Sequence, residues 1–360
     1  MKIVMDARFT RTDYHDGISR YGSSLIEATA KIAEVTMLIN DERQLALLPD
    51  VPWIKVNSPL SPRELFVAHQ INKLNPDAVF SPLQTMGSWG RRYGLILTLQ
   101  DLIYYLHPQP PGFLPLPVRV LWRLYHLAYW PQRLLLNRAD LVATISRTSQ
   151  SLIERFRLTR RPIRIIGNAP QPGKPPRARE PEASLVYMGS FMPYKNVQTI
   201  IRAMEFLPGF SLHLLSRITP ERRAELELLT PPGATVVYHN GVTDAEYDDL
   251  VSRATALVTL SKAEGFGLPL VESMTLGTPV VVADTEIFRE VGGTAARYAD
   301  AEDPAGFARE VRALADPEEW RRRSAASLVQ AGKYTWEASA RSLLRMAEEA
   351  AAIHARKMRN

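Results

Sequence analysis

Short hydrophobic runs in the first half of the chain alternate with segments whose apolar residues recur at helical spacing. The runs lie at 2–7, 35–40, 78–80, 95–99 and 141–145, and the helical segments begin at Gly17 and cover 63–73 and 119–138. Short apolar runs between polar residues are typical of buried strands. Strands that alternate with helices form a parallel sheet covered on both faces. The pattern therefore predicts an α/β domain in the first half.

The same alternation resumes after a break rich in proline. The second series has strands at 184–188, 211–215, 235–238, 256–260 and 279–283, and helices at 196–206, 220–229, 244–253, 268–276 and from Pro304 onward. Proline, glycine and charged residues crowd into the break, which is typical of an interdomain linker. We therefore expect a first domain at 1–167, a hinge at 168–182, a second domain at 183–335 and a C-terminal helix at 336–360. Two such domains leave a cleft between their strand ends, where open parallel sheets bind ligands.

The composition excludes several classes of protein. The chain is 46% hydrophobic and 23% charged, which is ordinary for a folded globular protein. It has no cysteine, and this absence excludes disulfides, thiolate metal sites and cysteine nucleophiles. Asp6 comes too early for the apolar core of a signal peptide, and no apolar run is long enough to cross a bilayer. We expect a cytoplasmic location.

Positive charge is concentrated in the first half of the chain. Residues 1–180 hold 24 Lys and Arg against 14 Asp and Glu, a balance of +10, whereas residues 181–360 hold 20 against 24, a balance of −4. This asymmetry indicates either an anionic partner or a solvated basic face. The chain has no zinc-finger spacing, aromatic RNA-binding signature or basic zipper region, so nucleic acid is not expected as a partner. An anionic membrane surface or an acidic ligand fits the charge at least as well.

The segment around Leu268 has the features of a phosphate site. The strand at 256–260 leads into a loop with two glycines, Gly265 and Gly267, that allow the backbone to approach a ligand closely. Proline is suited to the first helical turn and glycine to the C-terminal stop, so we predict a helix that begins near Leu268 and ends at Gly277. The amides of 266–268 then lie at the positive end of the helix dipole, where anions bind.

Two carboxylates flank this predicted phosphate site. Glu264 lies in the loop before the helix, and Glu272 lies one turn inside it. This spacing suits hydrogen bonds to hydroxyl groups on either side of a bound diphosphate. The alternative is a surface loop with two solvated glutamates.

The string from Glu264 to Glu272, EGFGLPLVE, resembles the E-x7-E motif of the retaining glycosyltransferases of family 4. Five further stretches are similar to that family and occur in the same order: 16–21, 143–146, 188–196, 239–243 and 288–292. The resemblance extends over most of the chain. It implies the GT-B fold, in which two Rossmann-like domains with parallel sheets face each other across a cleft and the C-terminal helices return to the first domain. It also implies a nucleotide-sugar donor in the second domain and an acceptor in the first.

The resemblance also implies roles for individual residues. Glu264 would contact the hydroxyls of the donor sugar, Glu272 would contact the ribose, and Lys195 would neutralise the leaving phosphate. Gly17 would let the first domain approach the donor phosphates. The remaining donor-binding positions would be Ser190, Asn240, Gly241, Val242, Gly265, Phe266, Gly267 and Leu268. Taken without the resemblance, the usual exposure of lysine favours a solvated surface residue at Lys195, and Gly17 could equally be an ordinary loop glycine.

The chain departs from the family pattern at two places. Ser190 stands where many relatives carry an arginine, so neutralisation of the diphosphate would depend more on Lys195 and the helix terminus. Gln100-Asp101 stands where the family usually has a His-Asp pair, and a glutamine cannot take up a proton near neutral pH. Asp101 could orient the acceptor or could cap the next turn. Retaining enzymes of this fold are thought to use the departing phosphate to assist the acceptor, so the resemblance still implies catalysis.

We therefore expect a retaining hexosyltransferase of cell-envelope biosynthesis. A similar N-terminal segment often accompanies GDP-mannose, which favours transfer of mannose to a lipid-linked or polysaccharide acceptor. The alternatives are a degenerate relative that binds a sugar nucleotide without catalysis and a nucleotide-sugar epimerase. The sequence contains neither a D-x-D pair nor a His-x-x-x-His set, so no metal or other cofactor is expected.

The segment 119–138 combines leucine, aromatic and arginine residues in the basic half. Such a helix can lie at a membrane interface and help to dock a lipid-linked acceptor on the inner face of the plasma membrane. The alternative is a core helix whose aromatic side chains pack inward, as apolar stripes at helical spacing usually do.

Overall fold

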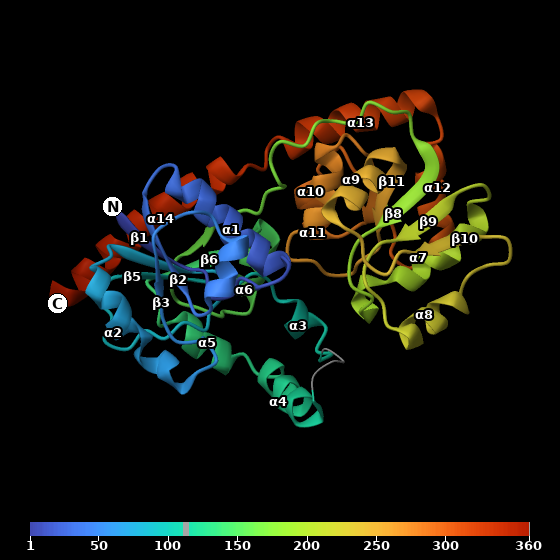
Figure 1. Cartoon of the computed structure of the whole chain (residues 1–360). Helices are drawn as coiled ribbons and strands as arrows, with labels where there is room; N and C mark the ends of the chain where they lie inside the picture. Colours follow the sequence, from blue (N-terminus) through green and yellow to red (C-terminus); the bar gives the residue numbers. More distant parts are fainter. Residues whose placement is uncertain (111–114, 360) are drawn as a thin grey trace. The chain divides into compact units, whose positions relative to one another are not determined.

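The computed structural model describes residues 1–110 and 115–359, and its contacts divide the chain into two compact units (Figure 1). Unit 1 consists of Met1–Asn168 and Thr335–Asn360, and unit 2 of Ala169–Tyr334. The first boundary lies next to the end of the first domain predicted at 167. The contacts assign the proline-rich segment from residue 169 to unit 2, whereas we predicted a hinge at 168–182.

Arg177 shows how the proline-rich segment is held on unit 2. Its amide donates a hydrogen bond to the carbonyl of Leu276 at 2.9 Å, and its guanidinium donates to the carbonyl of Ala254 at 2.7 Å. The guanidinium carbon also lies 4.6 Å from the centre of the Trp320 ring. Burial lowers the pKa of Arg177 to about 10, and the nearby Glu180 and Glu182 oppose this shift.

Within the described residues, unit 1 is built on a seven-stranded parallel sheet in the order β3-β2-β1-β4-β5-β6-β7. The strands are β1 (Lys2–Asp6), β2 (Glu34–Ile39), β3 (Trp53–Lys55), β4 (Ala78–Ser81), β5 (Gly94–Thr98), β6 (Leu141–Thr144) and β7 (Ile163–Ile165). The helices are α1 (Gly17–Ala30), α2 (Val67–Ile71), α3 (Ile103–Leu106), α4 (Leu116–His126), α5 (Trp130–Leu136), α6 (Arg147–Arg155) and α14 (Trp336–Arg359). Ile3 of β1 is in register with Val35 of β2 and Ala78 of β4.

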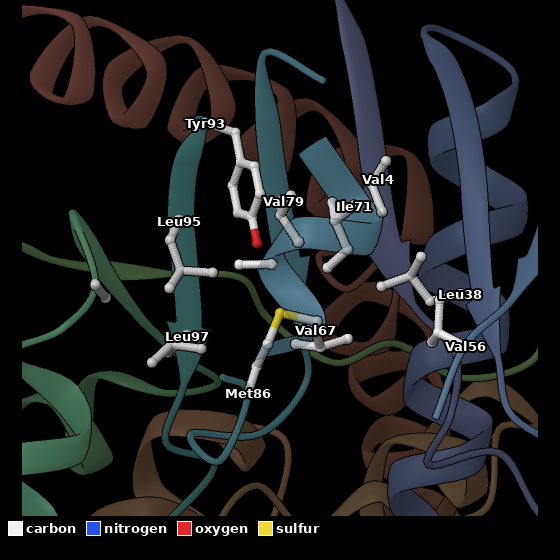
Figure 2. Close-up of a cluster of buried hydrophobic side chains, with 12 residues drawn as sticks. Val4, Leu38, Val56, Val67, Ile71, Val79, Met86, Tyr93, Leu95 and Leu97 are labelled. Carbon is white, nitrogen blue, oxygen red and sulfur yellow. The ribbon is translucent and has the colours of Figure 1, made fainter. Parts of the chain in front are cut away.

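Helices cover both faces of this sheet. Each strand contributes side chains to both faces, because successive side chains of a strand point to opposite sides. One face packs against α2 in a cluster of Val4, Leu38, Val56, Val67, Ala68, Ile71, Val79, Met86, Tyr93, Leu95, Leu97 and Ala139 (Figure 2). On the other face, α14 crosses β5 at Gly94, where a Cβ atom would lie 2.5 Å from the backbone of Ala350. Tyr21 of α1 packs on Trp336 of α14, with ring centroids 6.0 Å apart. The C-terminal helix is therefore a layer of unit 1.

Several elements of unit 1 differ from the prediction. The single helix predicted at 119–138 is wrong, because α4 ends at His126 and α5 begins at Trp130. Pro131 explains the break, since proline has no N–H and its ring would clash with the carbonyl four residues earlier. The segment 63–73 forms only the short helix α2 between 3₁₀ turns. We did not predict β3, β7 or α6. The two outer strands are only three residues long, and most residues of α6 are polar.

Unit 2, all of whose residues are described, has a six-stranded parallel sheet in the order β10-β9-β8-β11-β12-β13. Its strands are β8 (Glu182–Tyr187), β9 (Ser211–Leu214), β10 (Thr235–Tyr238), β11 (Ala254–Thr259), β12 (Val280–Ala283) and β13 (Arg297–Ala299). Its helices are α7 (Val197–Ala203), α8 (Pro220–Glu227), α9 (Asp244–Arg253), α10 (Leu268–Thr275), α11 (Glu286–Gly292), α12 (Pro304–Ala313) and α13 (Pro317–Ala331). The predicted strands and helices of this half are all present, while α11 and β13 were not predicted. The predicted helix at 196–206 is shorter than expected, because it ends in a 3₁₀ turn at Met204–Phe206.

Candidate functional site

The sheet of unit 2 reverses its strand order between β8 and β11. From β8 the chain proceeds outward through β9 and β10, and from β11 it proceeds outward in the other direction through β12 and β13. Loops that leave the carboxyl ends of two such neighbouring strands diverge to opposite sides and leave an opening, where ligands of open α/β sheets bind. The loops after β8 and β11 carry Lys195 and Glu264, respectively.

Asn196 positions Lys195 at the end of the loop after β8. Lys195 is the last residue of a 3₁₀ turn, and Asn196 follows it in the left-handed conformation with φ 53°. The side-chain amide of Asn196 is buried. Its nitrogen donates to the carbonyl of Ala301 at 2.7 Å, and its oxygen accepts from the Thr199 hydroxyl at 2.8 Å. Asparagine tolerates this conformation better than most residues and here also ties the turn to the unit. We did not single out Asn196, although it follows Lys195 directly in the sequence.

The two loops meet through an ion pair. The Lys195 Nζ atom donates to Glu264 Oε1 at 2.6 Å, and both side chains are only 15% exposed. Next to this pair, the amide of Lys262 donates to the carbonyl of Tyr194 at 2.9 Å. The Ser261 hydroxyl holds the second loop by donating to the carbonyl of Ala263 at 2.9 Å. The structure thus brings together Lys195 and Glu264, two of the predicted site residues, which lie 69 positions apart in the chain.

The N-terminus of α10 lies directly after Glu264 and has no side-chain cap. The helix begins at Leu268, as predicted, and its capping residue is Gly267 with φ +88°. A Cβ atom at this glycine would be strained by that φ and would lie 3.2 Å from the Phe288 ring. Pro269 has no N–H, and the amide of Leu270 donates to the carbonyl of Gly267 at 3.0 Å. The amide of Leu268 has no intrahelical acceptor, so this amide and those of the preceding loop are the groups that can meet an anion.

The aromatic residue of the glycine loop is turned into the unit. Phe266 is buried and packs edge-on against Tyr334, with ring centroids 5.3 Å apart. This packing anchors the loop and leaves its backbone as the part that can meet a ligand. Glu272 lies in the second turn of α10 and is buried, with 8% of its surface exposed.

Tyr187, at the end of β8, supports the other side of the site. It is buried, and its hydroxyl donates to the carbonyl of Ser190 at 2.7 Å. Burial raises the pKa of Tyr187, so the hydroxyl stays protonated and remains a donor. A Cβ atom at Gly189 would lie 2.9 Å from this hydroxyl, which explains the glycine there. The side chain of Ser190 is exposed. We did not predict a contribution from Tyr187, because its position in an apolar strand gave no functional signal.

The predicted donor-binding residues 240–242 follow β10, at the outer edge of the same end of the sheet. Asn240 has φ 55°, and its side-chain oxygen accepts from the amide of Ile218 at 3.0 Å. Gly241 has φ +103°, and its amide donates to the carbonyl of Leu215 at 2.9 Å. These two residues shape the turn, with Val242 after them, two strands away from β8.

In unit 1, Gly17 is the first residue of α1 and is exposed. Nothing lies within 4 Å of the position that a Cβ atom would take there. Unlike α10, this helix is capped, because Asp16 accepts from the amide of Ser19 at 2.9 Å and pairs with Arg11 at 2.6 Å. Of these two helix starts, α10 is therefore the one open to an anion.

A pocket of about 520 Å³ lies in unit 1 where β1 and β2 end. Polar groups line much of it, including Arg11, Asp13, Asp16, Asn40 and Asp41. Gln44 shapes its wall by donating to the carbonyls of Arg8 and Thr10, at 3.0 and 2.6 Å. A pocket with this lining suits a ligand with several hydroxyl groups.

Gln100 and Asp101 are both engaged by the backbone of unit 1. The side-chain amide of Gln100 donates to the carbonyl of Pro82 at 3.2 Å. The carboxylate of Asp101 accepts from the backbone amide of Ile103 at 2.9 Å, at the start of α3. Asp101 therefore caps the next turn, which is one of its two predicted roles. Across residues 1–110 and 115–359, no group of three or more His, Asp or Glu side chains is placed to hold a metal ion.

The site of unit 2 lies within a range of the chain that matches a family model. Residues 173–330 match the family model of glycosyl transferases group 1. The chain is 29% identical over 160 residues to O-antigen chain mannosyltransferase B of Escherichia coli, a match that covers 42% of each protein. It is 28% identical over 175 residues to O-antigen chain mannosyltransferase RfbU of Salmonella typhimurium, with 46% of this chain and 48% of that protein covered. The chain thus spans less than half the length of these relatives.

Solved structures match both units. Sucrose-phosphate synthase from Thermosynechococcus elongatus superposes with a TM-score of 0.69 at 19% identity, covering 96% of this chain and 98% of that structure. A second match, Anabaena HepE in complex with UDP-glucose, has a TM-score of 0.69 at 15% identity and covers 96% of this chain and 100% of that structure. These likenesses show the fold, and the predicted GT-B fold with two parallel-sheet α/β domains is confirmed.

Proposed function

We propose that this protein is a retaining glycosyltransferase that moves a hexose, most simply mannose, from a nucleotide-diphosphate sugar to a lipid-linked or polysaccharide acceptor. The observation that carries the proposal is the Lys195–Glu264 pair beside the uncapped N-terminus of α10. The matched family range includes all of these residues, and the O-antigen mannosyltransferases among the relatives support mannose and a cell-envelope acceptor.

The donor diphosphate would bind at the first amides of α10. Lys195 would turn from Glu264 to the phosphate next to the sugar, because a phosphate oxygen is a strong acceptor for an ammonium group. Glu264, released from the lysine, would accept hydrogen bonds from the sugar hydroxyls. The pair is thus held ready in the free protein, and the ligand replaces one ion pair by two charge-assisted contacts. Glu272 would bind the ribose hydroxyls.

Transfer would use the departing phosphate as the base. The bond from sugar C1 to the phosphate oxygen breaks while the acceptor oxygen bonds to C1 on the same face. The acceptor proton passes to an oxygen of the leaving phosphate. Lys195 and the amides of α10 stabilise the negative charge that develops there. The engagement of Gln100 and Asp101 by backbone groups supports a route in which neither of these two residues acts as the base.

The acceptor would enter the polar pocket at the ends of β1 and β2. Its lining of carboxylates, amides and Arg11 can exchange hydrogen bonds with a glycan in many orientations. Asp13 and Asp41 would select hydroxyl donors and disfavour an anionic group at that point.

Donor binding is tested first, by thermal unfolding of the protein with GDP-mannose, UDP-glucose and ADP-glucose. We expect GDP-mannose to raise the unfolding temperature, because at a concentration 100 times the Kd a ligand adds about 2.7 kcal/mol of stability. If no sugar nucleotide stabilises the protein, the proposed donor site is wrong. If UDP-glucose or ADP-glucose stabilises it more, mannose is wrong and the site stands.

Transfer is tested with Glu264→Gln and Lys195→Met, using the best donor and a mannose-containing acceptor. Each variant should lower the transfer rate about 100-fold or more, as loss of a charge-stabilising group does. Lys174→Met is the matched control, because it breaks another ion pair of unit 2, Lys174–Asp248 at 2.5 Å, that is also partly buried. Donor binding without any transfer would indicate a degenerate relative, and a changed sugar nucleotide without acceptor would indicate an epimerase. Either result would refute the proposal.

A further inference from the structure

The helix α4 is the most exposed apolar element of unit 1. None of its residues is buried, and Leu121 and Leu124 are 68% and 59% exposed. Figure 1 shows α4 as an outlying helix of this unit, away from the sheet. A core helix would bury such residues, so the expectation of a core helix is wrong for α4, whose leucines stay exposed.

The exposed Val118 lies apart, but five other exposed apolar residues, four of α4 and the Leu127 that caps its C-terminus, form one stripe. At 3.6 residues per turn, they fall within an arc of roughly 140°. We call this set the leucine stripe, and it consists of Leu116, Val120, Leu121, Leu124 and Leu127. All five side chains are at least half exposed. Contiguous apolar surface of this kind marks a site of contact with a partner or a membrane.

The opposite side of α4 is fastened to α3. The Trp122 ring packs edge-on against Tyr104, with centroids 4.9 Å apart, and His126 lies 5.1 Å from Tyr105. Burial lowers the pKa of His126, which favours the neutral ring in this aromatic cluster. The aromatic contacts therefore define which face of α4 turns inward, and the leucine stripe is the face that remains outside.

The charge around the stripe has one sign. No aspartate or glutamate occurs between Asp101 and Asp140, whereas this segment contains Arg119, Arg123, Arg133 and Arg138. Arg119 and Arg123 lie on α4, along one border of the leucine stripe. Phosphate groups of anionic lipids attract such arginines, and apolar side chains between them enter the acyl boundary.

A second copy of this chain fits the surface less well. In a twofold dimer the same patch meets itself, so Arg119 and Arg123 would approach the same arginines of the other copy, and the segment 102–139 has no acidic residue to offset them. The helix is also too short to cross a bilayer, because its 11 residues span about 16 Å against a hydrocarbon core of about 30 Å. Across residues 1–110 and 115–359, no helix has the length and hydropathy of a membrane span.

We propose that α4 lies in the surface plane of an anionic bilayer, with the leucine stripe in the acyl boundary and Arg119 and Arg123 at the phosphates. The proposal rests on unit 1 alone and does not depend on the proposed donor or reaction.

The test is sedimentation of the full chain with vesicles of phosphatidylcholine and phosphatidylglycerol, and with vesicles of phosphatidylcholine alone. The protein should bind the anionic vesicles, and higher salt should release it, because salt screens the arginine–phosphate attraction. The double variant Leu121→Ser, Leu124→Ser should weaken binding at least about tenfold, because binding then no longer moves two leucine side chains out of water. The double variant Arg119→Gln, Arg123→Gln should weaken binding to the anionic vesicles and leave binding to the neutral vesicles unchanged.

The matched control is Leu228→Ser, which removes an exposed leucine of unit 2 and should bind like the unchanged protein. Thermal unfolding checks that each variant is folded, and the exposed positions of Leu121, Leu124 and Leu228 predict unchanged unfolding temperatures for the leucine variants. Equal vesicle binding by the leucine variant and the unchanged protein would overturn the proposal. So would equal binding to neutral and anionic vesicles, or a dimer that the leucine variant abolishes in the absence of lipid.

Discussion

Two ion clusters lie at the carboxyl ends of the two parallel sheets, and they differ in how completely their hydrogen bonds are used. In unit 1, the buried Arg8 bonds in bidentate fashion to Asp6, at 2.7 and 3.0 Å, and to Glu64, at 2.6 and 3.0 Å. In unit 2, the Lys195 Nζ atom donates to Glu264 Oε1 at 2.6 Å and lies 5.4 Å from the centre of the Tyr194 ring, and both side chains of the ion pair keep 15% of their surface in water.

The remaining oxygens of the Arg8 cluster also have partners. The Ser81 hydroxyl donates to Asp6 at 3.1 Å, and the amide of Gly87 donates to Glu64 at 3.0 Å. Burial lowers the pKa of Arg8, but the two carboxylates outweigh it and raise the value overall. A cluster with every donor and acceptor satisfied has nothing left to offer a ligand. The Lys195–Glu264 pair has spare donors and acceptors, which is what a binding site requires.

The largest expected effect comes from Arg8→Met. It leaves two buried carboxylates without a cation, and breaking a buried ion pair in this way costs about 3–5 kcal/mol of the free energy of unfolding. Urea unfolding measures the loss. Arg223→Met is the control, because it breaks the Arg223–Glu227 pair, whose side chains are half exposed, and should cost at most about 1 kcal/mol. If Arg8→Met costs no more than the control, the cluster does not stabilise unit 1.

A rescue experiment sharpens this prediction. Arg8→Met combined with Asp6→Asn and Glu64→Gln removes the uncompensated charges. The triple variant should recover part of the lost stability, since neutral groups of the same shape cost less to bury than charges. A triple variant less stable than Arg8→Met would indicate that hydrogen bonding, and not charge, dominates the cluster.

The second expected effect is a small coupling energy in unit 2. A double-mutant cycle of Lys195→Met and Glu264→Gln, read by urea unfolding, should give only a small coupling energy, because one hydrogen bond joins the pair and both side chains keep 15% of their surface in water. The same cycle for Arg8→Met and Asp6→Asn should give a larger value. Equal coupling energies would remove the distinction between a structural cluster and a ligand site.

The smallest expected effect concerns a pair of neighbouring histidines in unit 2. His213 Nδ1 and His239 Nε2 lie 3.0 Å apart on β9 and just after β10. Burial lowers the pKa of His213, and the neighbouring His239 lowers it further. The unfolded chain therefore binds a proton at a higher pH than the folded protein, so the stability from this residue is present above pH 6.5 and is lost as the pH falls below it.

His213→Gln tests this prediction by comparison of urea unfolding at neutral and mildly acidic pH. The variant should lose less stability on acidification than the unchanged protein. His126 and His354, whose pKa values burial also lowers, remain in both proteins and cancel in the comparison. An identical pH dependence of the two proteins would contradict the assignment.

Most of the unit 2 fold could be predicted from the sequence, because its strands and helices carry strong local patterns. The start of α10 is one case, since Gly267 and Pro269 specify a helix N-terminus by their backbone preferences alone. The prediction was weaker where the pattern was short or polar, as in β3, β7 and α6. It failed at 119–138, where the apolar spacing continued across Pro131 and concealed the end of α4.

The candidate site could be predicted in part. Glu264 and the glycine loop were identified from the local motif, and Lys195 from the resemblance. Asn196 and Tyr187 were missed, because their contributions are a left-handed turn and a buried hydroxyl that depend on Ala301 and Ser190. Asp101 had two possible roles in the sequence, and the cap it forms is decided by the path of the chain toward Ile103.

By itself, the sequence determined the alternation of strands and helices, the division near residue 168 and the helix start at Leu268, because each depends on neighbours within one or two turns. The tertiary structure decided that Lys195 and Glu264 meet, since only the reversal of strand order between β8 and β11 places their loops together. It also decided that α14 completes unit 1 at Gly94 and that the leucine stripe of α4 stays outside. An amphipathic pattern says that one face must be covered, but the surface that covers it is a property of the whole fold.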